Sequence, residues 1–197
     1  ISLLALIGTL LAGLVVMVFT YSIMIVLTAK VSPFPFLKRY IPTALNVFSL
    51  SSSSASMPLN MDFCKNIGIS QRVYSFTIPF GATINMDGAM IALMTGVLFM
   101  AKTFGVTIDT SHIIMLIVSG MLLSMASPGV PGGSLVACTV LLKQMGVPMD
   151  CLPLVMVYLT VTDMICTVSN TTGDVAASVI VKKKKKLLDK NKYYQKN

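Results

Sequence analysis

The chain has 197 residues, a mean hydropathy of +0.83 and a formal net charge of +8. Only 11% of its residues are charged, against about 25% in soluble domains, so the composition indicates an integral membrane protein. The four cysteines have no paired spacing and there is a single histidine, which argues against a disulfide framework and against a zinc site.

The first predicted element is a membrane span over residues 1–29. This stretch has no charged residue, and it exceeds the roughly 20 residues needed to cross an apolar core. It lacks both a basic start and a small-residue cleavage site, so it is interpreted as a span and not as a signal peptide. The chain begins without Met inside apolar sequence, and we expect further spans to precede it in the full protein.

Basic residues after this span indicate the cytoplasmic side. By the positive-inside rule, residues 30–72 and the C-terminus are predicted to be cytoplasmic, and the first residue is predicted to lie outside. This prediction depends on Lys30, Lys38, Arg39, Lys65 and Arg72. Most of the remaining positive charge lies in a polybasic tail over residues 182–197, which suits anionic lipid and not nucleic acid.

Four consecutive serines, residues 51–54, lie at the centre of the next stretch, residues 40–66. Both ends of this stretch are predicted on the cytoplasmic side, so we expect a re-entrant hairpin with the serines at its tip. Non-helical backbone at membrane depth persists only inside protein or beside a wet cavity, and serine hydroxyls can satisfy its free polar groups. The alternative is a cytoplasmic loop that never enters the membrane.

The second span, residues 73–101, carries one charge, Asp87, within the segment GATINMDGAM. Gly81 and Gly88 flank a predicted break in this helix. A break frees carbonyl groups, and carbonyls together with a carboxylate can bind a cation. The alternative is a kink that serves packing alone.

Residues 113–142 are uncharged but are interrupted by the segment SPGVPGGS. The second span is predicted to end outside, and the last span, residues 151–181, must start outside to end at the cytoplasmic tail. The stretch between them therefore leaves and returns on the same side, which predicts a second re-entrant hairpin. Its Gly- and Pro-rich tip is a candidate gate over a bound substrate.

One face of the last span is polar, because four side chains recur at helical spacing: Asp163, Thr167, Asn170 and Asp174. At about 100° per residue they lie within about 60° of arc, in a column about 16 Å tall. Buried carboxylates are costly and indicate function, so this face suits an ammonium group and hard cations. The alternative is hydrogen bonding between helices, which Ser, Thr and Asn often supply.

Four motifs in this order resemble the glutamate transporter family of sodium-coupled dicarboxylate and amino acid symporters: SSSSASMP, GATINMDG, SPGVPGG and DMICTVSNTTGD. The resemblance covers nearly the whole chain. It implies an all-α membrane protein of transmembrane helices plus two re-entrant helical hairpins, corresponding to a partial transport domain over residues 1–181. It also implies a homotrimer in the full-length protein, with its scaffold spans before residue 1.

The resemblance also implies two sets of site residues. Sodium, the coupling ion, would bind oxygens of Gly81, Thr83, Asn85, Asp87, Ser124, Met125, Ser127, Asn170 and Asp174. The substrate would bind near Ser53, Val130, Gly132, Asp163, Cys166, Thr167 and Asn170.

Two departures from the family pattern bear on the substrate. Acidic-substrate members usually carry Arg where Cys166 stands, and some carry one where Ser51 stands; the hydroxyl that faces an acidic side chain is replaced by Ala89. A guanidinium is the natural partner of a second carboxylate, and burying that carboxylate unpaired is costly. We therefore expect a small neutral amino acid, and an acidic substrate remains the alternative.

The sequence thus predicts a non-enzymatic, sodium-coupled, elevator-type symporter of Ser-, Thr- or Ala-like substrates in the plasma membrane. An ion channel is the alternative from another class, because channels also use re-entrant loops and carboxylates. An intramembrane aspartyl protease would need two facing acids, normally within a Gly-x-Gly-Asp context, and TTGD lacks the first Gly.

Overall fold

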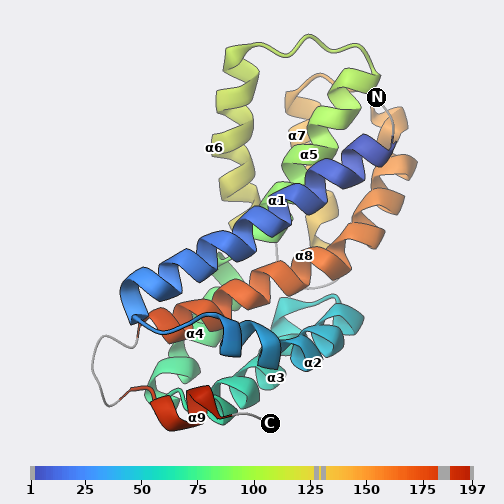
Figure 1. Ribbon diagram of the computed structural model, residues 1–197. Coiled ribbons are helices and arrows are strands. Elements are labelled where there is room, and N and C mark those ends of the chain that lie inside the picture. The colour runs from blue at the N-terminus through green and yellow to red at the C-terminus, as the bar shows by residue number, and fades with distance from the viewer. Residues whose placement is uncertain (1–2, 127–128, 130–131, 182–186, 196–197) are drawn as a thin grey trace.

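The computed structural model describes residues 3–126, 129, 132–181 and 187–195 (Figure 1). Within these residues every regular element is a helix, and the only β-type pairing is an isolated bridge between Ile69 and Leu188. Three segments are long and apolar enough to cross a membrane: Leu3–Ala29, Gln71–Thr103 and Met149–Ile180. The prediction of an all-helical membrane protein is confirmed.

The first and last of these segments contain the longest single helices. Helix α1 (Leu3–Met24) continues as a short π-helix, η1 (Ile25–Ala29), and the 3-10 turn η2 (Met149–Cys151) leads into α8 (Leu152–Ile180). The 29 residues of α8 extend about 44 Å at 1.5 Å per residue, which exceeds the thickness of a bilayer core. Helix α1 packs along α8 and α5, and many of its outward-facing side chains are apolar and exposed, as expected for a lipid-facing surface (Figure 1).

The middle segment is broken. Helix α4 (Gln71–Ile84) is separated from α5 (Asp87–Thr103) by two residues, Asn85 and Met86. The ψ angles of Asn85 and Met86 are 82° and 41°, outside the helical range. The break expected between Gly81 and Gly88 is therefore present, and it lies against α8.

Two helix pairs occupy the positions of the predicted hairpins. The first consists of α2 (Phe34–Leu50) and α3 (Ser53–Asn66), and the second of α6 (Thr110–Ala126) and α7 (Gly133–Gln144). Helix α2 begins six residues before the predicted start of the hairpin. Pro35 is compatible with this earlier start, because it lies in the first turn of the helix, where a backbone N–H has no partner within the helix. Re-entry of either pair into a membrane stays a prediction.

The tips of the two pairs touch. Ser51 turns the chain with a φ of 48°, and the Ser52 hydroxyl caps α3 by accepting a hydrogen bond from the Ala55 N–H at 3.1 Å. The same Ser52 hydroxyl donates to the Gly129 carbonyl at 2.7 Å, and the Ser54 N–H donates to it at 3.2 Å. The serine run therefore forms the turn of the first pair and binds the tip of the second.

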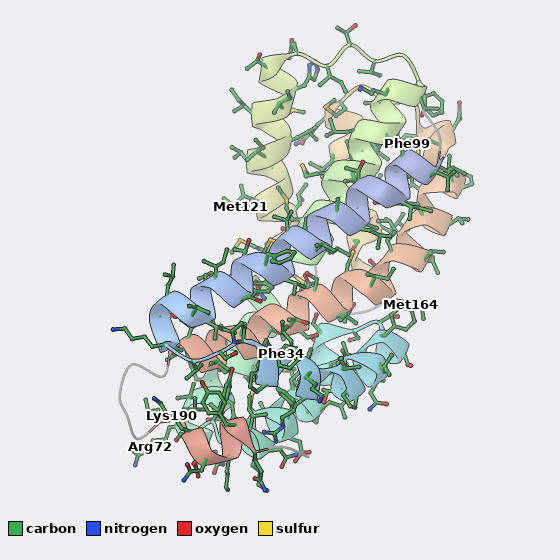
Figure 2. All side chains as sticks on the ribbon, viewed as in Figure 1. Phe34, Arg72, Phe99, Met121, Met164 and Lys190 are labelled. Carbon is green, nitrogen blue, oxygen red and sulfur yellow. The ribbon has the colours of Figure 1, made fainter. Side chains whose placement is uncertain are left out.

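The two ends of the molecule differ in charge. Arg72 and Lys190 lie at one end, and Phe99 lies at the other (Figure 2). The segments predicted to be cytoplasmic gather at the first end, where Arg39 contacts the C-terminal residues. This arrangement agrees with the topology expected from the sequence, while the orientation in a membrane stays a prediction.

The end of the chain is packed against the protein. Residues 187–195, which include α9 (Lys190–Tyr194), form what we call the C-terminal clasp. Its Leu188 and Tyr193 side chains are 4% and 1% exposed. Its hydrogen bonds join it to α2, to the segment before α2 and to the connection between α3 and α4: Ser70 N to Leu187 O at 2.9 Å, Asp189 N to Gly68 O at 2.8 Å, Arg39 Nη1 to Lys192 O at 2.6 Å, and Tyr193 Oη to Ser32 O at 2.8 Å. The sequence predicted a basic tail here; residues 182–186 lie outside the described residues, but the Leu188 and Tyr193 side chains that follow are buried.

Candidate functional site

A small polar pocket lies where the two tips, the helix break and α8 converge. Its volume is about 30 Å³, which is room for water and not for an amino acid. The lining residues come from all four regions: Ser51, Ser53, Met86, Ala89, Gly129, Ser134, Asp163, Cys166, Thr167 and Asn170.

The polar face of α8 forms one wall of this pocket. Asp163 accepts hydrogen bonds from the Ser134 hydroxyl at 3.1 Å and from the Gly132 N–H at 3.3 Å. The Thr167 hydroxyl donates to the Asp163 carbonyl at 2.7 Å, as polar side chains in membrane helices often do. The carboxylate of Asp163 thus connects α8 to the tip of the second pair, and it is the one acid among the residues that line the pocket.

Most of the predicted substrate residues lie together. Ser53, Asp163, Cys166, Thr167 and Asn170 all line the pocket, together with Ala89 and Ser51. Gly132 is not in the lining, although its N–H reaches Asp163; Val130 lies outside the described residues. None of the pocket-lining residues is basic, so a bound second carboxylate would find no fixed cation among them.

A second polar cluster lies farther along α8, around Asp174. The Asn85 amide donates to the Asn170 carbonyl at 2.8 Å and to Asp174 Oδ1 at 3.0 Å. The Gly88 N–H lies 2.7 Å from both Asp87 Oδ1 and Asn170 Oδ1. These bonds tie the helix break to α8.

The acids of this cluster have unused oxygens. Asp87 Oδ2 and Asp174 Oδ2 are buried, and neither has a hydrogen-bond partner among the described residues. A Cβ on Gly81 would overlap the Asp174 carboxylate, so glycine there allows the broken helix to approach this acid. Buried carboxylate and carbonyl oxygens are hard ligands, and the cluster therefore fits a cation such as Na⁺.

The remaining predicted sodium ligands are not joined to this cluster. Ser124 is buried and its hydroxyl donates to the Met121 carbonyl, whereas the Thr83 and Met125 side chains are exposed. Among the described residues, no hydrogen bond links these three to Asp87 or Asp174. Ser127 lies outside the described residues, and the roles of all four oxygens stay predictions. No group of three His, Cys or Asp side chains in the described ranges could hold a metal ion, so any cation site here depends on backbone and amide oxygens as well.

Two residues of the site were missed from the sequence. Ser134, which binds Asp163, was passed over although it ends the SPGVPGGS motif. Tyr21 on α1 is buried beside the Asp174 cluster, and the available signal was a phenolic hydroxyl in an uncharged span.

A broken helix and two helix pairs that meet at a buried polar pocket are the features of a membrane transport protein. A profile of the Sodium:dicarboxylate symporter family matches residues 1–184, and the chain belongs to this family. The family is one of transporters and not of enzymes.

Curated relatives include neutral amino acid transporters. The chain is 31% identical over 170 residues to Neutral amino acid transporter B(0) of Homo sapiens, covering 86% of this chain and 31% of that protein. It is 32% identical over 151 residues to Neutral amino acid transporter A of Homo sapiens, covering 76% and 28%. The mouse B(0) protein is 32% identical over 171 residues, covering 86% and 30%. The chain therefore spans less than a third of the length of these relatives.

Proposed function

We propose that the full-length protein is a sodium-coupled symporter of small neutral amino acids, such as serine, threonine or alanine. Asp163 binds the substrate ammonium group, with Thr167 beside it, and Asn170 and the backbone near Ser53 receive the α-carboxylate. The transport domain moves as an elevator within a homotrimer in the plasma membrane. The C-terminal lysine run faces anionic lipid, and segments outside this chain supply the trimer contact.

The observation that carries the choice of substrate is the uncharged pocket around Cys166. Cys166 is 2% exposed and lies at the pocket with Ala89, and no lysine or arginine lines the pocket. A zwitterion brings one carboxylate and one ammonium, and Asp163 is a fixed partner for the ammonium. An acidic amino acid brings a further carboxylate, which would be buried without a cation. The names of the matched relatives agree with a neutral substrate.

Competition for labelled serine uptake tests this choice. In proteoliposomes with the full-length protein, unlabelled serine should compete strongly and aspartate weakly. Cys166→Arg introduces a bidentate partner for a second carboxylate and should shift preference toward aspartate, whereas Cys166→Ser should retain the preference for serine. A parent protein that already prefers aspartate or glutamate would overturn the neutral assignment and support the acidic alternative.

Sodium coupling is supported by the two buried, unpartnered carboxylate oxygens of Asp87 and Asp174. Asp174→Asn removes one of these charges and should raise the sodium concentration needed for half-maximal uptake. Unchanged sodium dependence in both Asp174→Asn and Asp87→Asn would remove the coupling proposal.

Counterflow separates a symporter from an ion channel. An alternating-access protein exchanges labelled external substrate for unlabelled internal substrate, even against the label gradient. A channel with the same carboxylates would not accumulate label in this way, so absence of counterflow in a preparation that conducts ions would favour the channel.

A further inference from the structure

Tyr21 contributes a buried hydroxyl next to the Asp174 cluster. The side chain comes from α1, is 8% exposed, and packs into the apolar cluster at the clasp end of the molecule. Its hydroxyl is buried, and in the described part of the chain no group forms a hydrogen bond with it. A buried hydroxyl without a partner costs free energy, so its retention needs a reason.

The surroundings of Gly173 identify the side chain that lies next to the Tyr21 hydroxyl. A Cβ built on Gly173 would lie 2.5 Å from the Tyr21 oxygen and would also overlap the Asn85 amide nitrogen. Both atoms therefore border the same small space, which glycine leaves open on α8. Tyr21 thus faces the one side chain that bridges Asn170 and Asp174.

The side-chain nitrogen of Asn85 donates hydrogen bonds to two oxygens that a bound cation would need as ligands. One N–H bonds the Asn170 carbonyl and the other bonds Asp174 Oδ1, so both hydrogens are engaged and the Tyr21 hydroxyl has no acceptor there. An N–H donor directed at these oxygens also repels a cation. For Asn85 to serve as a ligand, its amide must turn by about half a revolution and present its oxygen.

We propose that Tyr21 is a positioning residue that holds Asn85 in the orientation that binds the cation. The half-turn exchanges the amide nitrogen for the amide oxygen beside the Tyr21 hydroxyl. The hydroxyl then donates to Asn85 Oδ1, and this oxygen still has a lone pair for the cation. Tyr21 therefore gains its missing partner only in the loaded site, which favours sodium binding. This inference rests on the proposed sodium-coupled function.

Tyr21→Phe in the full-length protein tests the proposal, because it removes the hydroxyl and keeps the ring. Sodium titration of labelled serine uptake should show the half-saturating sodium concentration raised by about three- to tenfold, the range for one lost hydrogen bond. The maximal rate at saturating sodium should be nearly unchanged, because the substrate pocket is intact. Sodium-dependent thermal stabilisation of the purified variant should shift to higher sodium by the same factor.

Tyr158→Phe is the matched control. Tyr158 is also buried, but its hydroxyl bonds Ala92 and Thr95 away from Asn85, so its loss should not change the sodium requirement. A second variant, Gly173→Ala, fills the space between the hydroxyl and the amide and should raise the sodium requirement as well. An unchanged sodium requirement in Tyr21→Phe, or an equal shift in Tyr158→Phe, overturns the role of Tyr21. Sodium-independent uptake by the parent protein would instead overturn the proposed function.

Discussion

Replacing Gly132 with alanine should weaken substrate binding because it strains the backbone, and not because the added methyl group clashes with a neighbour. Gly132 precedes α7 with a φ of 77°, and its N–H reaches Asp163 Oδ2. A Cβ there would have no neighbour within 4 Å, so a side chain finds room. The left-handed conformation is the obstacle, because it costs an L-residue about 1–2 kcal/mol.

The size of the effect on substrate affinity depends on whether the backbone strain is present in the closed tip, the open tip or both. If the tip of the second helix pair is the gate, the strain penalises the closed tip that contacts Asp163 and is relieved when the tip opens. About 1–2 kcal/mol corresponds to roughly a five- to thirtyfold increase in the substrate concentration for half-maximal uptake. Labelled serine uptake at saturating sodium measures it directly.

Gly146→Ala provides the matched control. Gly146 has a φ of 70° and is equally free of neighbours, but it lies beyond the far end of α7. Alanine there should lower thermal stability through the same backbone strain and leave the half-saturating substrate concentration unchanged. Equal effects of the two variants on substrate affinity, or no effect of Gly132→Ala, would refute the reasoning.

Three further outcomes are expected from contacts described in the structure. Gly81→Ala places a Cβ against the Asp174 carboxylate, so sodium titration should show at least about a tenfold higher requirement, as for a displaced charged ligand. Arg39→Ala removes bonds to the C-terminal clasp, and hydrogen exchange of the clasp should become faster. At the start of α6, hydrogen bonds from the His112 N–H and the Ser111 hydroxyl lower the pKa of Asp109 to about 2. This cap therefore stabilises the helix fully at pH values above about 3.9, the pKa of Asp109 in the unfolded chain. Hydrogen exchange of the amides in the first turn should become faster only as the pH falls from about 4 toward 2.

Each of these has a control. Gly8→Ala, on a helix face with no atom within 4 Å, should leave sodium dependence unchanged. Lys38→Ala, beside Arg39 in sequence, should leave exchange of the clasp unchanged. Asp109→Asn preserves the cap without a titrating group, so exchange in this variant should not depend on protonation in the same pH range. If a control variant responds as strongly as the variant with which it is paired, the argument for that pair is contradicted.

The sequence predicted those features of the fold that depend on residues close together in the chain. Helical spacing identified the polar face of α8, and the glycines around Asp87 identified the break between α4 and α5. The pairing of the Asn85 amide with Asp174 could not be predicted, because it joins residues 89 positions apart. The contact between Ser52 and Gly129 joins two tips and depends in the same way on how the whole helix set packs.

The packing of residues 187–195 could not be predicted from the sequence for a related reason. A lysine-rich end is usually solvated, and nothing near Leu188 in sequence reveals its bridge to Ile69. The left-handed turn at Ser51 was equally hidden, since glycine is the usual residue at such a position. The surrounding contacts, including the cap by Ser52, determine that conformation.

The docked chain end has a consequence for biogenesis. Leu188 and Tyr193 complete an apolar cluster with Phe36, Tyr40 and Phe63, yet they follow these residues by more than 120 positions in the sequence. Segments fold in the order in which they emerge from the ribosome, so the base of the first helix pair stays unfinished until residues 187–195 have been made. A chain that stops at residue 186 would leave these apolar surfaces uncovered, and we expect pulse-chase labelling to show its faster degradation. The clasp thereby makes completion of the first helix pair depend on residues that lie far along the chain.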